Sequence, residues 1–465
     1  MPEFHAEPYL YLPAVSHKSA LIAWGAFYFR TNSRGVMKIV DDGDLKYVHP
    51  PRKDSIGAQS APYGPARVEV YDAAGATVAV AQTEVTNHCW VTGLRPDTEY
   101  RYAVFVKDQE WASGERWDWS SREHALVQAG GRYDNRFQTF PEATAPANEM
   151  AFAVIGDFGI GMRRDSPTRR QMQVAYAMRR IVGAADVRFI LTTGDNIYAG
   201  QRVLGIPIGG TGDEDDDWFF TYFQPYRYII NRIPVYPSIG NHDADETEER
   251  DDRAQIEDNF YLRERIASEE AAGRASFGPG LFYRFRYGSD IEFVCIDTSK
   301  EDFFRGKRLF EYPKHWEFVE QALPANDPVR WRIPFAHHPL YSAGPQHHNT
   351  RGMQRLLPLF ERSGVRAMFA GHEHNFQHSR ANRLDHFVTG AGGKVRRTPP
   401  DRFIEAHTES WATDCHFLLA KISGSTLTVR AIGALDDPSA APVDITRFTP
   451  GREALNGPIE VRLRG

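Results

Sequence analysis

Five short polar motifs, each at the end of a short apolar run, restrict the folds open to this chain more than any other feature. They read Gly156-Asp157, Gly194-Asp195-Asn196-Ile197-Tyr198, Gly240-Asn241-His242-Asp243, His337-His338-Pro339 and Gly371-His372-Glu373-His374. Polar motifs at the ends of strands that alternate with helices are typical of an α/β domain, in which the loops beyond the strands build the site. The pattern therefore predicts an α/β domain whose five motifs converge on one place.

The chain is too long for one ordinary core, and its composition changes near residue 145. For 465 residues we expect two domains. Residues 1–142 are predicted to form an all-β sandwich, and residues 143–150 a linker rich in proline, alanine and threonine. Residues 151–433 are predicted to form the α/β domain that holds the motifs, and residues 434–465 a C-terminal tail packed on or near it.

The N-terminal region carries the signature of a sandwich corner. Leu94, Pro96 and Tyr100 lead into an alternating strand, an arrangement in which the tyrosine hydroxyl bonds back to the backbone. The stretch resembles a fibronectin type III domain, and another kind of β-sandwich is the alternative. We expect the aromatic cluster of this region to pack in the core or between domains rather than to form a binding platform. The cluster comprises Trp111, Trp117 and Trp119.

After the linker, apolar runs alternate with helical patterns. Strands are predicted at 150–155, 187–192, 291–296, 331–336 and 365–370, and helices at 168–182 and 353–362. The acidic run 213–217 is interpreted as a solvated loop, with a calcium site as the alternative. The charged segment 245–279 is interpreted as a lid.

The side chains of the five motifs suit a site with two metal ions. Carboxylates, a phenol, an amide oxygen and imidazoles are all metal ligands. Asp195 is suited to bridge two ions because one carboxylate has two oxygens. His372 and His374 lie two residues apart, so in an extended segment they would point the same way. A single histidine is usually an ordinary core or surface residue, but all five motifs in this order favour a metal site.

With these motifs, residues 151 to about 433 resemble the calcineurin-like metallophosphoesterase superfamily and, within it, the purple acid phosphatases. The resemblance implies a two-sheet αββα sandwich. Many members of the superfamily carry Asp-x-His at the first motif, but Gly159 stands here where that histidine would be. The second motif instead matches the purple-phosphatase pattern Gly-Asp-x-x-Tyr, which ends at Tyr198. Without the family, Tyr198 would be interpreted as an ordinary core residue.

The resemblance also implies a role for each metal-binding residue. A first metal, Fe(III), is expected to be held by Asp157, Asp195, Tyr198 and His374. A second, divalent ion (Fe, Zn or Mn) is expected to be bridged by Asp195 and held by Asn241, His337 and His372. His337 is chosen over His338 because the family pattern is His-x-Pro. Outside the metal shell, His242 and the pair His347-His348 are expected to face the phosphate or the leaving group.

These residues predict an enzyme that hydrolyses phosphomonoesters by in-line attack of metal-bound hydroxide. One alternative is a small-molecule phosphodiesterase of the same superfamily. Another is an inactive fibronectin-like binding protein with a degenerate phosphoesterase domain. The expected partner is a small-molecule phosphate ester, and a homo-oligomer is compatible with the sequence.

Composition and charge narrow the remaining classes. Hydrophobic content of 42% and charged content of 25% are typical of a globular protein. The net charge of -6 argues against a nucleic-acid surface, and no apolar run is long enough to span a membrane. The three cysteines predict buried small side chains rather than a disulfide framework. The first residues lack a leader pattern, so we expect a cytoplasmic protein, or a secreted or periplasmic one if the sequence is a trimmed mature form.

Overall fold

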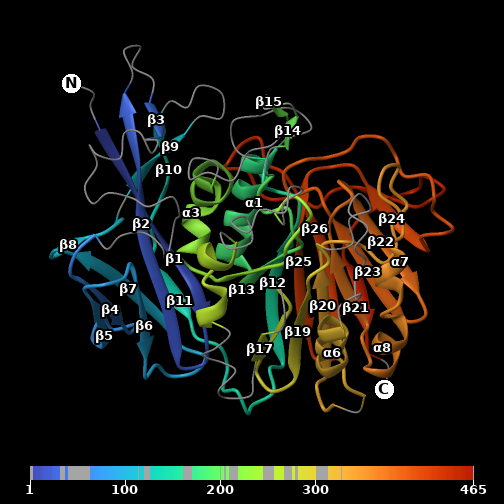
Figure 1. Ribbon diagram of the computed structural model, residues 1–465, viewed down its shortest axis with the longest axis horizontal. Coiled ribbons are helices and arrows are strands. Elements are labelled where there is room, and N and C mark those ends of the chain that lie inside the picture. The colour runs from blue at the N-terminus through green and yellow to red at the C-terminus, as the bar shows by residue number, and fades with distance from the viewer. Residues whose placement is uncertain are drawn as a thin grey trace.

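The computed structural model places an all-β region beside an α/β region (Figure 1). It describes residues 4–31, 37–39, 63–113, 115–119, 126–160, 170–198, 201–203, 206–208, 218–243, 256–265, 275–277, 281–299, 313–325 and 327–463. The acidic run 213–217 and most of the predicted lid 245–279 lie outside the described residues. Within the described part of the chain, no helix is long and apolar enough to cross a membrane.

The N-terminal region is built from antiparallel sheets. One sheet contains β1 (Phe4–Val15), β2 (Ser19–Thr31), β3 (Met37–Ile39) and β6 (His88–Thr92). The other contains β11 (Arg136–Gln138), β7 (Glu99–Val106), β4 (Ala66–Tyr71), β5 (Thr77–Thr83) and β8 (Gln109–Glu110). A separate ribbon pairs β9 (Glu115–Trp119) with β10 (Leu126–Arg132). Buried side chains from both main sheets, such as Trp24 and Val104, belong to one hydrophobic core.

The predicted tyrosine corner is confirmed. The hydroxyl of Tyr100, at the start of β7, accepts a hydrogen bond from the backbone N–H of Arg95 at 2.9 Å. Trp111 packs as expected, since its ring lies 5.1 Å from that of Tyr63 and its indole N–H donates to the Gly25 carbonyl at 3.1 Å. The side chains of Trp117 and Trp119 lie outside the described residues.

The α/β region contains two large mixed sheets. The six-stranded sheet has the order β16 (Val235–Pro237), β13 (Val187–Thr192), β12 (Glu149–Ile155), β25 (His416–Ser423), β26 (Thr426–Gly433) and β29 (Ile459–Arg462). The ten-stranded sheet has the order β17 (Ala275–Phe277), β18 (Tyr283–Tyr287), β19 (Ile291–Ile296), β20 (Trp331–Ala336), β21 (Ala367–Ala370), β23 (Leu384–Thr389), β22 (Phe376–Ala381), β24 (Thr408–Ala412), β27 (Arg447–Phe448) and β28 (Ala454–Leu455). A small hairpin pairs β14 (Gln201–Val203) with β15 (Ile206–Ile208).

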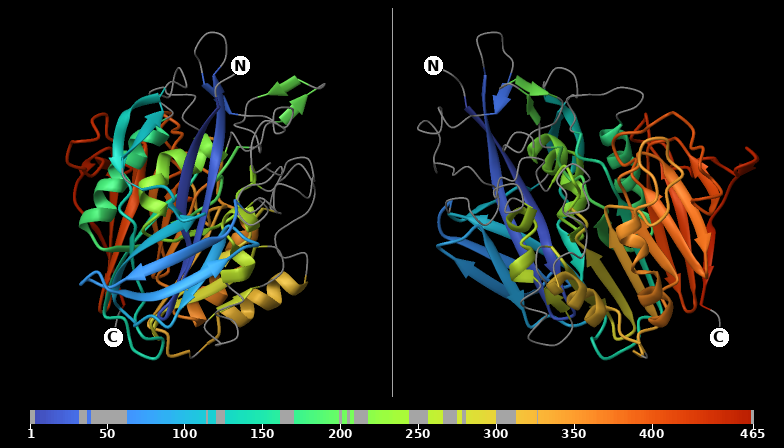
Figure 2. Two further views of the ribbon diagram at one scale, coloured as in Figure 1. Left: turned by 90° about the vertical axis from the view of Figure 1, so that its left-hand side faces the viewer. Right: turned by 45° about the vertical axis from the view of Figure 1, so that its right-hand side comes forward.

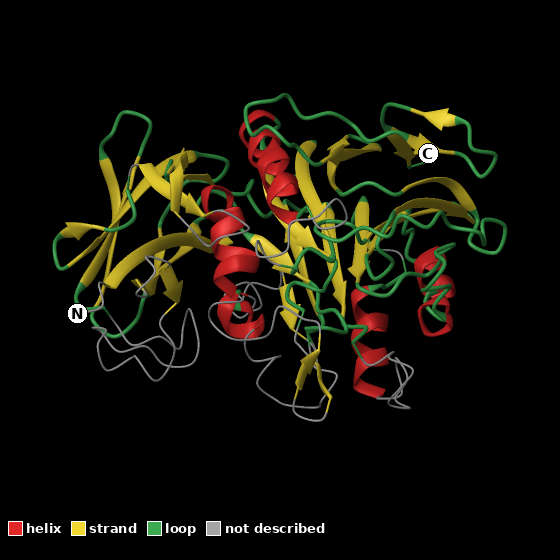
Figure 3. Ribbon diagram, turned by 90° about the horizontal axis from the view of Figure 1, so that it is seen from above, coloured by secondary structure: helices red, strands yellow, loops and turns green. Residues whose placement is uncertain are grey.

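The two sheets pack face to face with helices on their outer sides (Figure 3). Phe152 of the six-stranded sheet contacts Phe293 and Phe369 of the ten-stranded sheet, at ring-centroid distances of 5.2 and 5.9 Å. Alternate residues of β19, such as Val294, turn to the opposite face. There they pack against α6 (Pro313–Ala322) and α8 (Leu357–Arg362). Helix α1 (Gln171–Ala184) contacts the six-stranded sheet, which completes an αββα arrangement.

Most predicted elements are found, and one predicted helix is divided in two. The predicted strands correspond to β12, β13, β19, β20 and β21. The helix expected at 353–362 is divided into α7 (Arg351–Gln354) and α8, and Pro358 lies in the first turn of α8. Proline has no N–H to donate and its ring clashes with the carbonyl four residues earlier, so a continuous helix cannot pass through it.

Residues 434–463 are joined to the α/β region by strand pairing. Strand β29 pairs with β26 in one sheet, and β27 pairs with β24 in the other. The three cysteines Cys89, Cys295 and Cys415 are buried and free, as expected.

The N-terminal region packs against the π-helical turn η4 (Phe219–Phe223) and α3 (Gln224–Ile230) (Figure 2). Tyr9 and Phe27 contact the ring of Phe223 at 4.4 and 5.5 Å. Glu7 and Arg227 form an ion pair at 2.7 Å across this boundary, and both side chains are buried. The two regions therefore share an apolar interface that encloses a charged pair.

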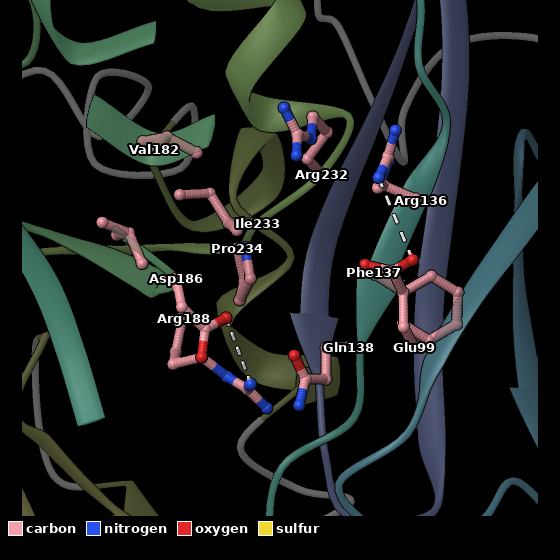
Figure 4. A pocket seen from close by; sticks show the side chains of 11 residues that line it. Glu99, Arg136, Phe137, Gln138, Val182, Asp186, Arg188, Arg232, Ile233 and Pro234 are labelled. Atoms are coloured by element: carbon pink, nitrogen blue, oxygen red, sulfur yellow. Dashed lines mark ion pairs between the residues drawn. The ribbon is translucent and has the colours of Figure 1, made fainter. Parts of the chain in front are cut away.

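A pocket of about 60 Å³ also opens at this boundary (Figure 4). Its lining includes Arg136 from the N-terminal region and Arg188 and Arg232 from the α/β region. The buried guanidinium of Arg188 donates to the backbone carbonyl of Thr139 at 2.7 Å. This polar contact connects the end of the N-terminal region to β13, the second strand of the α/β region.

Candidate metal centre

Two aspartates follow neighbouring parallel strands of the six-stranded sheet. Asp157 comes two residues after β12 and Asp195 comes three residues after β13, and Ile155 pairs with Thr192 at the ends of these strands. Both aspartates have left-handed backbone conformations, with φ of 53° and 50°. Such conformations cost a non-glycine residue about 1–3 kcal/mol and concentrate at functional sites. The strained turns place two buried carboxylates side by side.

Glycines in the neighbouring motifs allow other loops to approach these carboxylates. A Cβ atom on Gly240 would lie 2.1 Å from Oδ1 of Asp195, and one on Gly371 would lie 2.4 Å from Oδ2 of Asp157. No side chain fits at these distances. The third and fifth motifs therefore carry glycine where their backbone passes directly against the two aspartates.

The side chains expected to hold the second ion lie close together and form the second group. They are Asn241, His337 and His372. They come from the loop after β16, the end of β20 and the loop after β21. Nε2 of His337 lies 2.8 Å from Oδ1 of Asn241, and Nδ1 of His372 lies 3.1 Å from each of these two atoms. Three potential ligand atoms thus surround one point.

A backbone carbonyl fixes the orientation of His337. Nδ1 of His337 lies 2.8 Å from the carbonyl oxygen of Thr193. Because a carbonyl can only accept a hydrogen bond, this nitrogen carries the proton and Nε2 presents its lone pair to the second group. Burial lowers the pKa of His337 and places that of His372 well below its ordinary value, so both imidazoles are neutral.

The first group consists of Asp157, Tyr198 and His374. Nε2 of His374 lies 3.2 Å from the hydroxyl of Tyr198 and 3.4 Å from Oδ1 of Asp157. Oδ1 of Asp157 is buried and has no hydrogen-bond partner among the described residues. Burial, followed by the charge of Asp195, raises the pKa of the Asp157 carboxyl well above its usual range. A buried oxygen with these properties fits a bound cation.

Asp195 lies between the two groups. Its Oδ1 is 3.5 Å from Nε2 of His337 in the second group, and it hydrogen bonds to Tyr198 in the first group. Asp157, Asp195 and His337 each offer a ligand atom, and these three atoms lie within 4.8 Å of one another. Carboxylates, neutral imidazoles, a phenol and an amide oxygen form a donor set suited to first-row transition metals. The described residues therefore fit two adjacent metal ions.

The structure also locates the three histidines expected outside the metal shell. His242 donates its backbone N–H to Asp195 Oδ1 at 3.1 Å, and its ring centroid lies 4.5 Å from that of Tyr198. The ring of His347 lies 3.9 Å from that of His372. His348 instead donates Nδ1–H to the carbonyl of Gly344, in its own loop, at 3.0 Å. The structure thus brings His242 and His347 against the two groups and ties His348 to its loop.

Two buried carboxylates in the motifs had no role in the sequence interpretation. Asp243 accepts hydrogen bonds from the backbone N–H groups of Ile197 and Gly240 at 2.9 and 2.8 Å, so it joins the second and third motifs. Burial, with a contribution from Asp195, raises its pKa to about 7. Glu373 lies between His372 and His374 and is fully buried. Their charge and their position inside a motif, next to an expected ligand, could have indicated a role in the site.

Comparison with known proteins gives the family. The family model described as calcineurin-like phosphoesterase matches residues 150–376. Tartrate-resistant acid phosphatase type 5 of Rattus norvegicus is 24% identical over 318 residues, which cover 63% of this chain and 89% of that protein. Purple acid phosphatase 17 of Arabidopsis thaliana is 26% identical over 280 residues, which cover 57% of this chain and 74% of that protein. The chain is a purple acid phosphatase-like metallophosphoesterase.

The fold comparison extends over the N-terminal region as well. The solved structure of PhoD aligns with 98% of this chain and 92% of its own, with a TM-score of 0.62 and 12% sequence identity. The whole architecture of this purple acid phosphatase-like chain, N-terminal sheets included, is therefore shared with a known protein.

The purple acid phosphatase-like site departs from Asp-x-His for a steric reason. A Cβ atom on Gly159 would lie 2.3 Å from the carbonyl oxygen of Asn196 and 2.5 Å from Cα of Ile197. These are backbone atoms of the segment that carries Tyr198. Gly159 also donates its N–H to the Asp195 carbonyl at 3.1 Å. The backbone that presents Tyr198 thus occupies the space that a histidine at position 159 would need.

Proposed function

We propose that this chain hydrolyses phosphomonoesters at a dinuclear metal centre. Fe(III) would be held by the first group together with Asp195, and a divalent Fe, Zn or Mn ion by the second group together with Asp195. The position of Asp195 between the two groups carries the proposal, because only a shared carboxylate at that place links two ions closely. Tyr198 supports iron at the first site, since a phenolate is a hard anionic ligand.

Bound ions of this kind supply Lewis-acid activation of water and of the phosphoryl group. Other residues of the chain orient the proposed ligands and the histidines beside them. Asp243 holds the loops of the second and third motifs together, and Thr193 fixes the tautomer of His337. His242 and His347 lie against the two groups and would donate hydrogen bonds or a proton to the phosphoryl or leaving oxygen. Such a role contributes roughly 10²–10⁴-fold to the rate.

All proposed ligands follow residue 150. We propose that residues 1–142 act as a separate domain that braces the α/β region through the contacts with η4 and α3. Support comes from the buried ion pair Glu7–Arg227, which joins β1 to α3 and contains no proposed ligand.

A substrate comparison tests the proposal. Metal-loaded protein is assayed with p-nitrophenyl phosphate and with bis(p-nitrophenyl) phosphate, and its metal content is measured in parallel. We expect two metal ions per chain and a higher kcat/KM for the monoester. A higher kcat/KM for the diester would replace the phosphomonoesterase proposal with a phosphodiesterase, and a metal-loaded but inactive protein would support a binding role.

His242→Ala gives a sharper test of the catalytic assignment. It should lower kcat by roughly 10²–10⁴-fold and leave the metal content unchanged. Loss of metal in this variant would move His242 into the set of metal ligands. His407→Ala is a matched control, because His407 is an exposed histidine of the same region.

A further inference from the structure

Glu373 is a fully buried carboxylate located between His372 and His374, which belong to different groups of the metal centre. Its Oε2 accepts a hydrogen bond from the backbone N–H of His347 at 2.9 Å. Its Oε1 accepts one from Nε of Arg396 at 2.8 Å. A buried carboxylate is costly unless it is paired and hydrogen bonded, and Glu373 has partners for both oxygens.

Two glycines leave room for Glu373, one beside its side chain and one beside its backbone carbonyl. A Cβ atom on Gly344 would lie 2.3 Å from Cδ of Glu373, and one on Gly390 would lie 2.2 Å from its carbonyl oxygen. Two loops that are separate in the sequence therefore pass directly against Glu373. A closely packed, charged residue fixes their positions more firmly than an apolar contact of the same size, because hydrogen bonds depend on direction.

Two hydrogen bonds hold the loop that carries His347, one at the backbone N–H of this residue and one at its carbonyl oxygen. Glu373 accepts from the N–H of His347, and Oγ of Ser342 donates to its carbonyl oxygen at 2.7 Å. This arrangement places the His347 ring 3.9 Å from the ring of His372. Of these two contacts, the one through Glu373 connects the loop directly to the segment that contains the ligands.

Arg396 is anchored to the same segment. Its backbone N–H donates to the carbonyl of His374 at 2.7 Å, and its guanidinium pairs with Glu373. The side chain of Arg396 is 23% exposed whereas that of Glu373 is fully buried. Glu373 thus joins an inner element, the ligand segment, to two outer elements, the His347 loop and Arg396.

We propose that Glu373 is a positioning residue, which holds the imidazole of His347 in place against the second group. Glu373 itself contacts neither substrate nor metal in this proposal. The inference rests on the proposed function, in which His347 acts on the phosphoryl or leaving oxygen. The competing explanation is that Glu373 and Arg396 form an ion pair that stabilises the fold alone.

Amide hydrogen exchange provides a test that does not depend on catalysis. Exchange at the His347 N–H is measured by mass spectrometry on the peptide spanning 341–350 of the full-length, metal-loaded protein. Glu373→Gln retains only one acceptor oxygen for two donors, so the His347 N–H should exchange roughly tenfold faster, as loss of one hydrogen bond predicts. Glu373→Asp is a second variant that keeps the charge but is too short by one methylene group to reach both partners.

A double-mutant cycle tests the consequence for the reaction. Glu373→Gln alone should lower kcat/KM about tenfold, but in a His347→Ala background it should lower kcat/KM less than twofold, because the group that it positions is absent. The metal content should be the same in all variants. Glu292→Gln is a matched control, since Glu292 is also fully buried and pairs with arginines but lies on β19 away from the ligands.

The outcomes separate the explanations. Unchanged exchange at His347 in both Glu373 variants, loss of metal in Glu373→Gln, or an equal effect of Glu373→Gln in the two backgrounds would each overturn the positioning role. If the parent protein hydrolyses no phosphate ester, the proposed function fails, and the exchange measurement still decides whether Glu373 holds the His347 loop.

Discussion

The phenol oxygen of Tyr198 lies 3.2 Å from Nε2 of His374, and both side chains are buried. Burial, followed by the charges of Asp195 and Asp157, raises the pKa of Tyr198 well above its ordinary value. Without a cation the phenol therefore keeps its proton. A bound metal ion would favour the phenolate among these carboxylates, so in the proposed metal centre Tyr198 would report whether the first site is occupied.

The first prediction concerns the colour of the iron-loaded protein. If the Tyr198 phenolate binds Fe(III), oxidised protein should show a visible charge-transfer band, and Tyr198→Phe should abolish the band while the ring still packs. Absorption spectra and iron content are measured on the same samples, because Mn or Zn loading would leave the protein colourless. Tyr226→Phe is the control, as it removes the hydroxyl of another buried tyrosine. A band that persists in Tyr198→Phe would make Tyr198 a core residue.

The second prediction concerns the shared carboxylate. Asp195→Ala should lose both metal ions and nearly all activity, because the substitution removes the carboxylate between the first and second groups. Elemental analysis of the purified variant is the measurement. Asp385→Asn serves as a control, since Asp385 is a buried carboxylate that pairs with His378 at 2.7 Å, away from the two groups. Retention of one ion in Asp195→Ala would restrict Asp195 to a single site.

A third prediction follows from the close approach at Gly159. Gly159→Ala forces the backbone at Asn196 and Ile197 to move, so the variant should lose about 1–3 kcal/mol of unfolding free energy and bind metal more weakly. Denaturant unfolding and metal titration measure the two effects. Gly183→Ala is the control, because Gly183 lies in α1 with only Arg232 within 4 Å, and alanine there should stabilise the helix by about 0.5–1 kcal/mol. Equal stabilities for the two variants would refute the steric argument.

The buried pair across the region boundary gives a fourth prediction. Glu7→Gln removes the carboxylate charge from the buried ion pair with Arg227, so it should cost about 3–5 kcal/mol of unfolding free energy. Glu7→Gln combined with Arg227→Met removes both charges and should cost less than the sum of the single changes. Denaturant unfolding of the four proteins completes the cycle. Additive effects would show that the pair makes no direct contribution to the interface.

The fifth prediction concerns acid stability. Burial lowers the pKa of His386 to about 3, whereas in the unfolded chain its pKa is about 6.5. Between these values the unfolded state binds the extra proton, so the stability contributed by neutral His386 is present above about pH 6.5 and is lost as the pH falls toward 3. At pH 5 the loss relative to neutral pH is about 2 kcal/mol.

The variant His386→Gln should reduce this acid dependence. Its amide oxygen can accept the backbone N–H of Leu340, which donates to Nε2 of His386 in the parent protein. Unfolding free energy is measured by denaturant titration at pH 7, 6 and 5. His407→Gln, at an exposed position, should leave the slope against pH unchanged. An identical slope in His386→Gln and the parent protein contradicts the assignment.

The sequence predicted the strands that are buried on both faces, since such strands are mostly apolar runs. The bounds of β13, β19 and β20 match the expectation residue by residue. Local patterns do not reveal pairing between distant segments, so the entry of residues 447–448 and 459–462 into two different sheets came from the structure alone. The break between α7 and α8 could have been predicted from Pro358.

The residues of the candidate site could be predicted from the sequence, but the hydrogen bonds that position them could not. The motifs contain every residue of the first and second groups, because each motif follows an apolar strand. The contact of Glu373 with the N–H of His347 joins residues 26 positions apart through a side chain, and no spacing rule indicates such a bond. The turn of His348 toward Gly344 likewise depends on the local path of the loop.

Gly159 and Tyr198 set a restriction on how this site can change over time. The backbone of Asn196 and Ile197 fills the volume beside Gly159, so this backbone excludes a histidine at 159. In the proposed metal centre, a histidine ligand at 159 would clash with this backbone, and loss of Tyr198 without that histidine would leave the first ion one ligand short. Under that proposal, replacing the tyrosine ligand by a histidine at 159 would require the backbone of both loops to move, in addition to the two substitutions.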